Sequence, residues 1–110
     1  MEMKDGFAAV VHLKIKPEKL DRIKALVADV GDAMSAEKEF VHAWVHHSKD
    51  DPTSLVIYEA WSCDIDYFMK NLFTKSYRKT YEAEISRALR EERNIEVLDY
   101  VQSYPGRRES

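Results

Sequence analysis

The residues with the clearest potential for chemistry lie together in the stretch LVIYEAWSCDIDYF, from Leu55 to Phe68. This stretch begins with the pattern of a strand and ends with that of a helix, and it carries Glu59, Trp61 and Tyr67 near the junction. A glutamate that faces a cleft beside a tryptophan is a natural general base, because burial raises its pKa toward the working pH. The alternative is a structural glutamate that pairs with a lysine or arginine.

The aromatic residues around this glutamate also have two interpretations. Trp61 and Tyr67 either line a pocket or anchor the strands to the helices as core side chains. Tyr77 and Tyr81 follow at helical spacing, a pattern more typical of a core stripe. A buried tyrosine hydroxyl needs a hydrogen-bond partner, however, so either of these two could also direct its oxygen into a cleft.

The remaining polar residues offer little sign of a metal or cofactor site. The chain has four histidines, His12, His42, His46 and His47. His42 and His46 share a strand face but lie about 13 Å apart along an extended chain, and no zinc-type spacing of cysteine and histidine is present. The three glycines are scattered, which excludes a phosphate-binding loop. We expect no metal and no cofactor, and we expect the charged run Arg90–Arg93 to be a solvated helix end.

Length and composition indicate a single globular domain. The chain has 110 residues, 45% of them hydrophobic and 34% charged. Its net charge of -3 provides no basic field for nucleic acid, so no nucleic-acid partner is expected. No apolar run approaches the ~20 residues of a membrane span, so no membrane association is expected.

Two features favour a cytoplasmic location. Cys63 is the only cysteine and cannot form an internal disulfide, which is typical of a reducing compartment. The segment Met1–Val11 lacks the basic segment and the long apolar run of a signal peptide. We therefore expect a cytoplasmic protein.

Hydrophobic periodicity predicts the elements that must position these residues. Alternating and β-rich segments predict four strands, at Phe7–Lys16, Phe40–His47, Leu55–Trp61 and Ile95–Tyr104. The polar segment Ser48–Ser54 is expected to be the turn of a hairpin.

Three segments have the spacing of amphipathic helices. The first begins at Pro17, which suits the first helical turn, and runs to about Met34. Ser62 is expected to cap a second helix that carries Ile65, Phe68, Met69 and Leu72. A longer third helix carries Tyr77, Tyr81, Ile85 and Leu89, which recur at every fourth residue.

The order strand, helix, strand, strand, helix pair, strand predicts an α+β fold of ferredoxin-like βαββαβ type. One four-stranded antiparallel sheet would carry helices on one face only. We expect one domain over residues 1–110, with a core of about 7–104 and a polar tail at 105–110. Because the strands carry large apolar residues on both faces, we expect the uncovered face to pack sheet on sheet in a homodimer. The alternative is an apolar face that stays exposed.

In this order and spacing the chain resembles the antibiotic biosynthesis monooxygenase family, in particular its quinol-monooxygenase-like members. The resemblance covers roughly Val11 to Tyr104. It rests on VHLKIKPEKLDRIKALV, VIYEAWSCDIDYF, the helix start TKSYRKTY and the closing strand. Its most specific part is Glu59–Trp61, at the end of the third strand.

The resemblance implies a dimeric α+β barrel with a site between the sheet and the helices of each protomer. It implies oxidation of a small quinol, phenol or anthrone by O2 without metal or flavin. Trp61 and Tyr67 match aromatic positions of the family, and Glu59 or Tyr81 would supply the polar catalytic group. The expected substrate-contacting residues are Val11, Ile57, Phe68 and Tyr77.

The resemblance also leaves a second hypothesis open. The family pattern has an asparagine where Ile57 stands and, in our alignment, an arginine where Tyr81 stands. These differences favour a non-catalytic dimer of the same fold that binds a small ligand.

Overall fold

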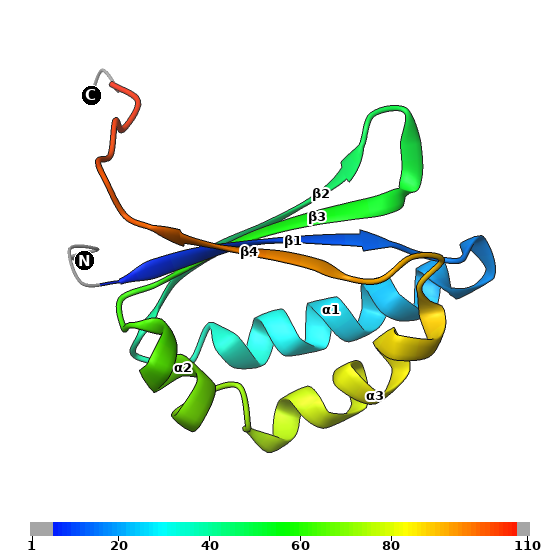
Figure 1. The fold of residues 1–110 in the computed structure, drawn as a ribbon, viewed down its shortest axis with the longest axis horizontal. Coiled ribbons are helices and arrows are strands. Elements are labelled where there is room, and N and C mark those ends of the chain that lie inside the picture. Colours follow the sequence, from blue (N-terminus) through cyan, green and yellow to red (C-terminus); the bar gives the residue numbers. More distant parts are fainter. Residues whose placement is uncertain (1–5, 108–110) are drawn as a thin grey trace.

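The computed structural model describes residues 6–107 and has the predicted order of strands and helices (Figure 1). The elements are β1 (Phe7–Lys14), the 3-10 helix η1 (Pro17–Lys19), α1 (Leu20–Met34), β2 (Phe40–Ser48), β3 (Asp51–Trp61), α2 (Ile65–Asn71), the 3-10 helix η2 (Ser76–Arg78), α3 (Lys79–Ala88) and β4 (Asn94–Asp99). None of the helices in the described residues is both long and apolar enough to cross a membrane.

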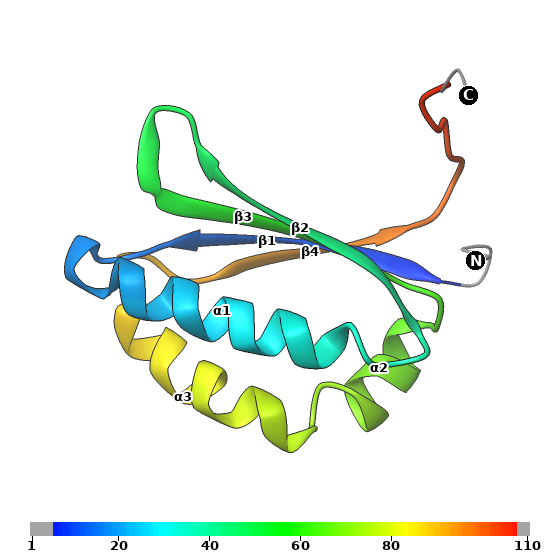
Figure 2. The same ribbon diagram turned by 180° about the vertical axis from the view of Figure 1, so that it is seen from behind.

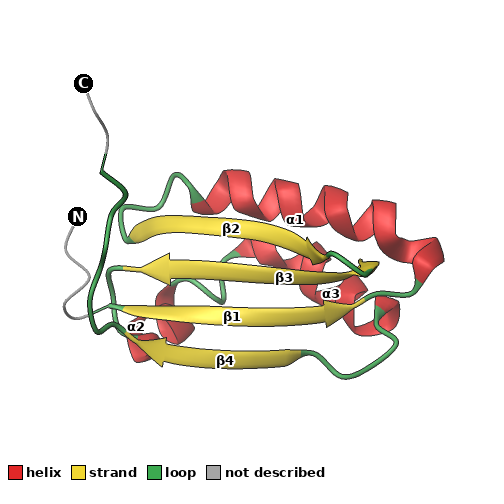
Figure 3. Ribbon diagram, turned by 90° about the horizontal axis from the view of Figure 1, so that it is seen from above, coloured by secondary structure: helices red, strands yellow, loops and turns green. Residues whose placement is uncertain are grey.

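The four strands form one antiparallel sheet in the order β2-β3-β1-β4 (Figure 3). All three α-helices lie on the same face of this sheet, with α1 and α3 side by side (Figures 1 and 2). The prediction of an α+β, ferredoxin-like fold is therefore confirmed. We call the covered side the helix face and the other side the open face.

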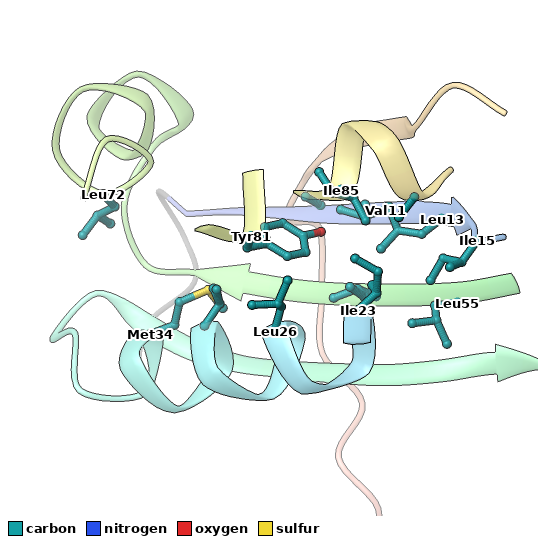
Figure 4. Close-up of a cluster of buried hydrophobic side chains, with 14 of the residues drawn as sticks. Val11, Leu13, Ile15, Ile23, Leu26, Met34, Leu55, Leu72, Tyr81 and Ile85 are labelled. Atoms are coloured by element: carbon teal, nitrogen blue, oxygen red, sulfur yellow. The ribbon is translucent and has the colours of Figure 1, made fainter. Parts of the chain in front are cut away.

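The helix face holds the hydrophobic core (Figure 4). The predicted stripe of the first helix is confirmed, because its buried residues Ile23, Leu26, Val30 and Met34 follow a three-to-four spacing. From the sheet, the odd-numbered residues of β1 from Phe7 to Leu13 face these side chains and are buried. Leu13 is completely buried.

The predicted turn at Ser48–Ser54 is wrong in its second half, because β3 already begins at Asp51. Ser48 pairs with Asp51, and the connection between the strands is therefore only Lys49 and Asp50. The Asp51 carboxylate accepts hydrogen bonds from the backbone and hydroxyl of Thr53 and from the Ser54 hydroxyl. These polar side chains thus bond to each other within the strand rather than forming a longer loop.

The last predicted strand is too long, because β4 ends at Asp99 rather than at Tyr104. Asp99 pairs with Phe7, the first residue of β1, so within residues 6–107 the residues after Asp99 have no neighbouring strand. Val101 and Tyr104 are 90% and 84% exposed. The segment that carries them leaves the sheet on the open-face side (Figure 1).

Further boundaries also differ from the predictions. The third helix is shorter than expected, because Tyr77 lies in η2 and Leu89 follows the end of α3 in extended conformation. β1 ends at Lys14, and Ile15 forms a separate bridge with Leu89. Asp64 rather than Ser62 caps α2, because its carboxylate accepts from the Tyr67 backbone N–H at 2.8 Å. The Ser62 hydroxyl instead donates to the Glu39 carbonyl at 3.1 Å.

Candidate functional site

A cavity of about 450 Å³ lies between the helix face of the sheet and the helices. All four strands and all three α-helices contribute to its lining, which is mostly aliphatic and aromatic. Its volume falls within the range of small-molecule sites, roughly 300–1,000 Å³. The polar side chains in this lining therefore decide what the cavity can do.

Glu59 is the carboxyl group that β3 directs into this cavity. Residues two apart on a strand share a face, so Ile57, Glu59 and Trp61 all lie on the helix face. The Glu59 carboxylate accepts a hydrogen bond from Trp61 Nε1 at 3.1 Å. Burial raises the pKa of Glu59, and this hydrogen bond and the positive charge of Arg78 only partly oppose the effect.

The predicted alternative for Glu59 was a direct ion pair, and the described residues give it none. Its one hydrogen bond comes from an indole N–H, which is a neutral donor. A carboxyl group with a raised pKa and a neutral partner is a stronger base than an exposed glutamate, which suits it to accept and return a proton.

Arg78 and Arg93 bring positive charge to the same cavity wall. Arg78 is only 9% exposed, and its guanidinium carbon lies 5.7 Å from the ring centre of Phe68 and 5.1 Å from that of Phe73. Both nitrogens of the Arg93 fork donate to the carboxylate of Glu82, at 3.1 and 3.3 Å. The cavity thus combines apolar walls with a small charged cluster.

Sequence reasoning missed this cluster. The charged run Arg90–Arg93 was expected to be solvated, but Arg93 is half-buried because it pairs with Glu82 and lines the cavity. The sequence pattern did not reveal Arg78, because a stripe at every fourth residue from Tyr77 omits it. Counting from Arg78 at spacings of three, four and seven gives Tyr81, Glu82 and Ile85, which is the inward face of a helix with 3.6 residues per turn.

The structure brings some of the predicted site residues to the cavity. Its lining includes Glu59, Tyr81, Val11, Ile57 and Phe68. Tyr81 projects from α3 into the buried cluster, and burial raises the pKa of its hydroxyl (Figure 4). Five of the eight predicted side chains therefore share one site.

The other three lie beside the cavity rather than in its lining. Trp61 is completely buried against the rings of Phe40 and Phe68, with ring centres 5.2 and 5.0 Å away, and reaches the site through its hydrogen bond to Glu59. Tyr67 is 40% exposed. Its hydroxyl donates to the Glu39 carboxylate at 2.6 Å.

Tyr77 also bonds outside the lining, through its hydroxyl to the carboxylate of Glu37 at 3.0 Å. Burial and this negatively charged partner raise the pKa of Tyr77 to about 12. The phenol of Tyr77 therefore stays protonated at neutral pH.

Comparison with known families gives one match. The model of a family described as antibiotic biosynthesis monooxygenase matches residues 6–67, which include β1, α1, β2, β3 and the start of α2. No curated protein matches the chain significantly.

Several solved structures share the fold. The protein Rv0793 from Mycobacterium tuberculosis superposes with a TM-score of 0.81 at 16% identity, over 92% of this chain and 100% of that one. A conserved protein from Methanosarcina mazei gives 0.77 at 19% identity, over 86% and 92%. A Caulobacter crescentus protein, provisionally named an antibiotic biosynthesis monooxygenase, gives 0.78 at 20% identity, over 91% and 93%. At these identities the likeness shows a shared fold.

Proposed function

The chain belongs to the antibiotic biosynthesis monooxygenase family, and from this premise we propose that it is a cofactor-independent monooxygenase acting on a small aromatic molecule in the helix-face cavity. Family membership supports a monooxygenase-like function in general. The proposed substrate is a quinol, phenol or anthrone, and the proposed oxidant is O2. The proposed location is the cytoplasm.

The observation that carries this proposal is the Glu59 carboxyl group in the wall of an apolar cavity. Removal of a proton from an anthrone-type CH2 group gives an electron-rich anion that reacts with O2 directly. The resulting carbon-bound hydroperoxide loses water and leaves a carbonyl group. One O2 and one CH2 group thus give one C=O group and one H2O, and the substrate supplies all the electrons.

The proposed roles follow from where the side chains lie. Glu59 takes the substrate proton, and the Trp61 N–H holds its carboxylate in position. Val11, Ile57 and Phe68 provide apolar contacts, and Tyr81 offers a hydroxyl group to an oxygen of the substrate or the peroxide. Catalytic participation of Tyr67 and substrate contact by Tyr77 would require the substrate to extend beyond the cavity lining.

Oxygen uptake by the purified chain tests the proposal. The panel would contain quinols, catechols and anthrones, in metal-free buffer with a chelator. We expect uptake that the chelator does not affect and that Glu59→Gln lowers by about 10²–10⁴-fold, the usual contribution of a general base. The exposed Glu92 provides a matched control, because Glu92→Gln should leave the rate unchanged. Full activity of Glu59→Gln would remove Glu59 as the base.

A specific observation favours a second function, a non-catalytic dimer that binds a small ligand. Ile57 and Tyr81 both line the cavity, at positions where the family resemblance predicts an asparagine and an arginine. This second function predicts saturable binding of aromatic compounds with no oxygen uptake from any of them. Turnover of a single panel compound would exclude it.

We also propose that the open face forms a homodimer. Trp44 is 55% exposed there and stacks on Tyr58 of β3, with ring centres 5.6 Å apart. Val10 lies opposite Tyr58 on β1. A second copy of the same face would cover these apolar side chains, and the segment with Val101 and Tyr104 extends on the same side, where it would reach that copy. Sedimentation velocity at micromolar concentration should give a mass of two chains.

A further inference from the structure

We propose that the ligand of the helix-face cavity is a flat apolar acid and that Arg78 binds its carboxylate. The proposal names a substrate class for the proposed monooxygenase and in that sense rests on the proposed function. It is argued from the hydrogen-bonding state of Arg78, from the charges around it and from the shape of the cavity.

The guanidinium of Arg78 has five N–H donors, and within the described residues almost none has a good acceptor. Its Nε is buried without a hydrogen-bond partner. Its Nη1 lies 3.5 Å from the sulfur of Met34, which is a weak acceptor. Its Nη2 lies 3.6 Å from the Glu82 carboxylate, beyond ordinary hydrogen-bond distance. A buried guanidinium whose N–H groups lack acceptors costs free energy, and a ligand that supplies an acceptor would remove this cost.

The carboxylate nearest to Arg78, that of Glu82, is shared with a second guanidinium group. Both carboxylate oxygens of Glu82 are engaged by the fork of Arg93. Glu59, the other acid of the cavity wall, has a raised pKa and therefore favours its neutral form more than an exposed glutamate does. Two guanidinium groups thus share the Glu82 carboxylate, and the hydrogen bonds go to Arg93, which leaves donors of Arg78 for a ligand.

Two aromatic rings hold Arg78 in place for such a ligand. Phe68 and Phe73 lie against the guanidinium, at 5.7 and 5.1 Å from its carbon, and restrict its orientation. Nε has no partner but is enclosed by protein, so a carboxylate that pairs with this edge must enter with a small shift of the neighbouring side chains. Nε and a terminal nitrogen of arginine match the two oxygens of a carboxylate in a planar, bidentate pair.

The same features decide against a phosphate ligand. A phosphate dianion would bring a second negative charge, and the other guanidinium, Arg93, is already paired with Glu82. The rest of the lining is apolar and suits a hydrocarbon ring system. The ligand class is therefore an aromatic molecule with a single carboxylate.

Binding of a matched pair of probes tests the proposal. 2-Naphthoate and its neutral isostere 2-naphthamide would be titrated into the full chain by calorimetry, under anaerobic conditions so that no turnover occurs. We expect the acid to bind at least ten-fold more tightly than the amide. Arg78→Met should abolish this preference and leave amide binding within two-fold, whereas Arg22→Met, which removes an exposed arginine paired with Glu84, should preserve it.

Three results would overturn the proposal. They are equal affinity for acid and amide in the unmodified protein, an acid preference that survives Arg78→Met, and no acid binding at millimolar concentration. Should Arg78→Met fail to fold, as judged by circular dichroism, the unmodified protein still gives an answer. The carboxyl pKa of bound 13C-labelled naphthoate should fall below its free value beside Arg78, and a raised or unchanged pKa would contradict the proposal.

The binding experiment and the oxygen-uptake experiment test separate claims, so one claim can fail while the other holds. An acid preference without oxygen uptake from any compound would remove the monooxygenase and retain the acid-binding cavity. Oxygen uptake from neutral quinols without an acid preference would remove the acid-binding proposal and retain the monooxygenase.

Discussion

The two faces of the sheet carry similar side chains in different surroundings, and the chain's two tryptophans illustrate the contrast. Trp61 lies on the helix face, fully buried among aromatic rings and bonded to Glu59. Trp44 lies on the open face, 55% exposed and stacked on Tyr58. Because strand residues alternate between faces, the same sheet lines a cavity on one side and exposes large aromatic side chains on the other. The contrast teaches that the face on which a strand places its tryptophan decides whether that side chain is buried in the core or exposed.

The largest expected effect tests the helix face. Trp61→Ala should lower the free energy of unfolding by about 3–5 kcal/mol, because it opens a cavity among Phe40, Phe68 and Glu59 and removes a buried hydrogen bond. Urea unfolding followed by circular dichroism measures this loss. A loss below about 1 kcal/mol would show that Trp61 is not a core residue.

The next effect tests the open face. Trp44→Glu should weaken homodimer association by about 2 kcal/mol or more, roughly 30-fold in Kd, because it replaces an apolar contact with a charge that a matching face cannot pair. Sedimentation velocity over a concentration series measures the change. Lys49→Glu, at the exposed connection between β2 and β3, is the control and should leave the dimer intact. An unchanged dimer in Trp44→Glu would place the interface elsewhere.

Much of this contrast could be predicted from the sequence. The alternating pattern correctly gave the strand that carries Ile57, Glu59 and Trp61, and helical spacing correctly gave the buried stripe of α1. The position of Arg78 was missed, because steps of four residues drift by about 40° each from the true face of a helix.

The end of β4 was missed for a different reason. The residues from Tyr100 to Tyr104 alternate like a strand, but a strand needs a neighbour to bond to, and β1 begins at the residue opposite Asp99. Local pattern predicts the capacity to form a strand, whereas the lengths of neighbouring strands decide where pairing stops. The charged cluster of Arg78, Glu82 and Arg93 likewise joins α3 and its preceding turn to the segment before β4, which no local spacing reveals.

A smaller effect concerns proton binding on the helix face. Because the pKa of Glu59 is raised in the folded chain, the folded state keeps a proton that the unfolded chain has already released. The stability that this carboxyl contributes is therefore complete below its ordinary pKa of 4.5 and declines as the pH rises through the folded value. The advantage of Glu59→Gln over the unmodified chain should grow over that window, by about 1.4 kcal/mol for each pH unit separating the two pKa values.

Unfolding free energies measured from pH 4 to pH 8 check this prediction. The exposed Glu92→Gln is the matched control and should differ from the unmodified chain by less than about 0.5 kcal/mol at each pH. An advantage of Glu59→Gln that shrinks with rising pH would mean that the carboxylate, not the acid, is the form that the fold stabilises.

The smallest expected effect concerns the N-terminal cap of α2, a helix that lies only on the helix face of the sheet. Asp64→Ala removes the acceptor for the Tyr67 N–H and should lower the free energy of unfolding by about 1 kcal/mol. Asp66→Ala removes an exposed acid from the same helical turn and keeps that cap intact, so this matched control should cost less than Asp64→Ala. Neither change touches the open face, so the dimer Kd from sedimentation should stay the same for both variants. A weaker dimer in Asp64→Ala would show that α2 contributes to association, and association would then not be confined to the open face.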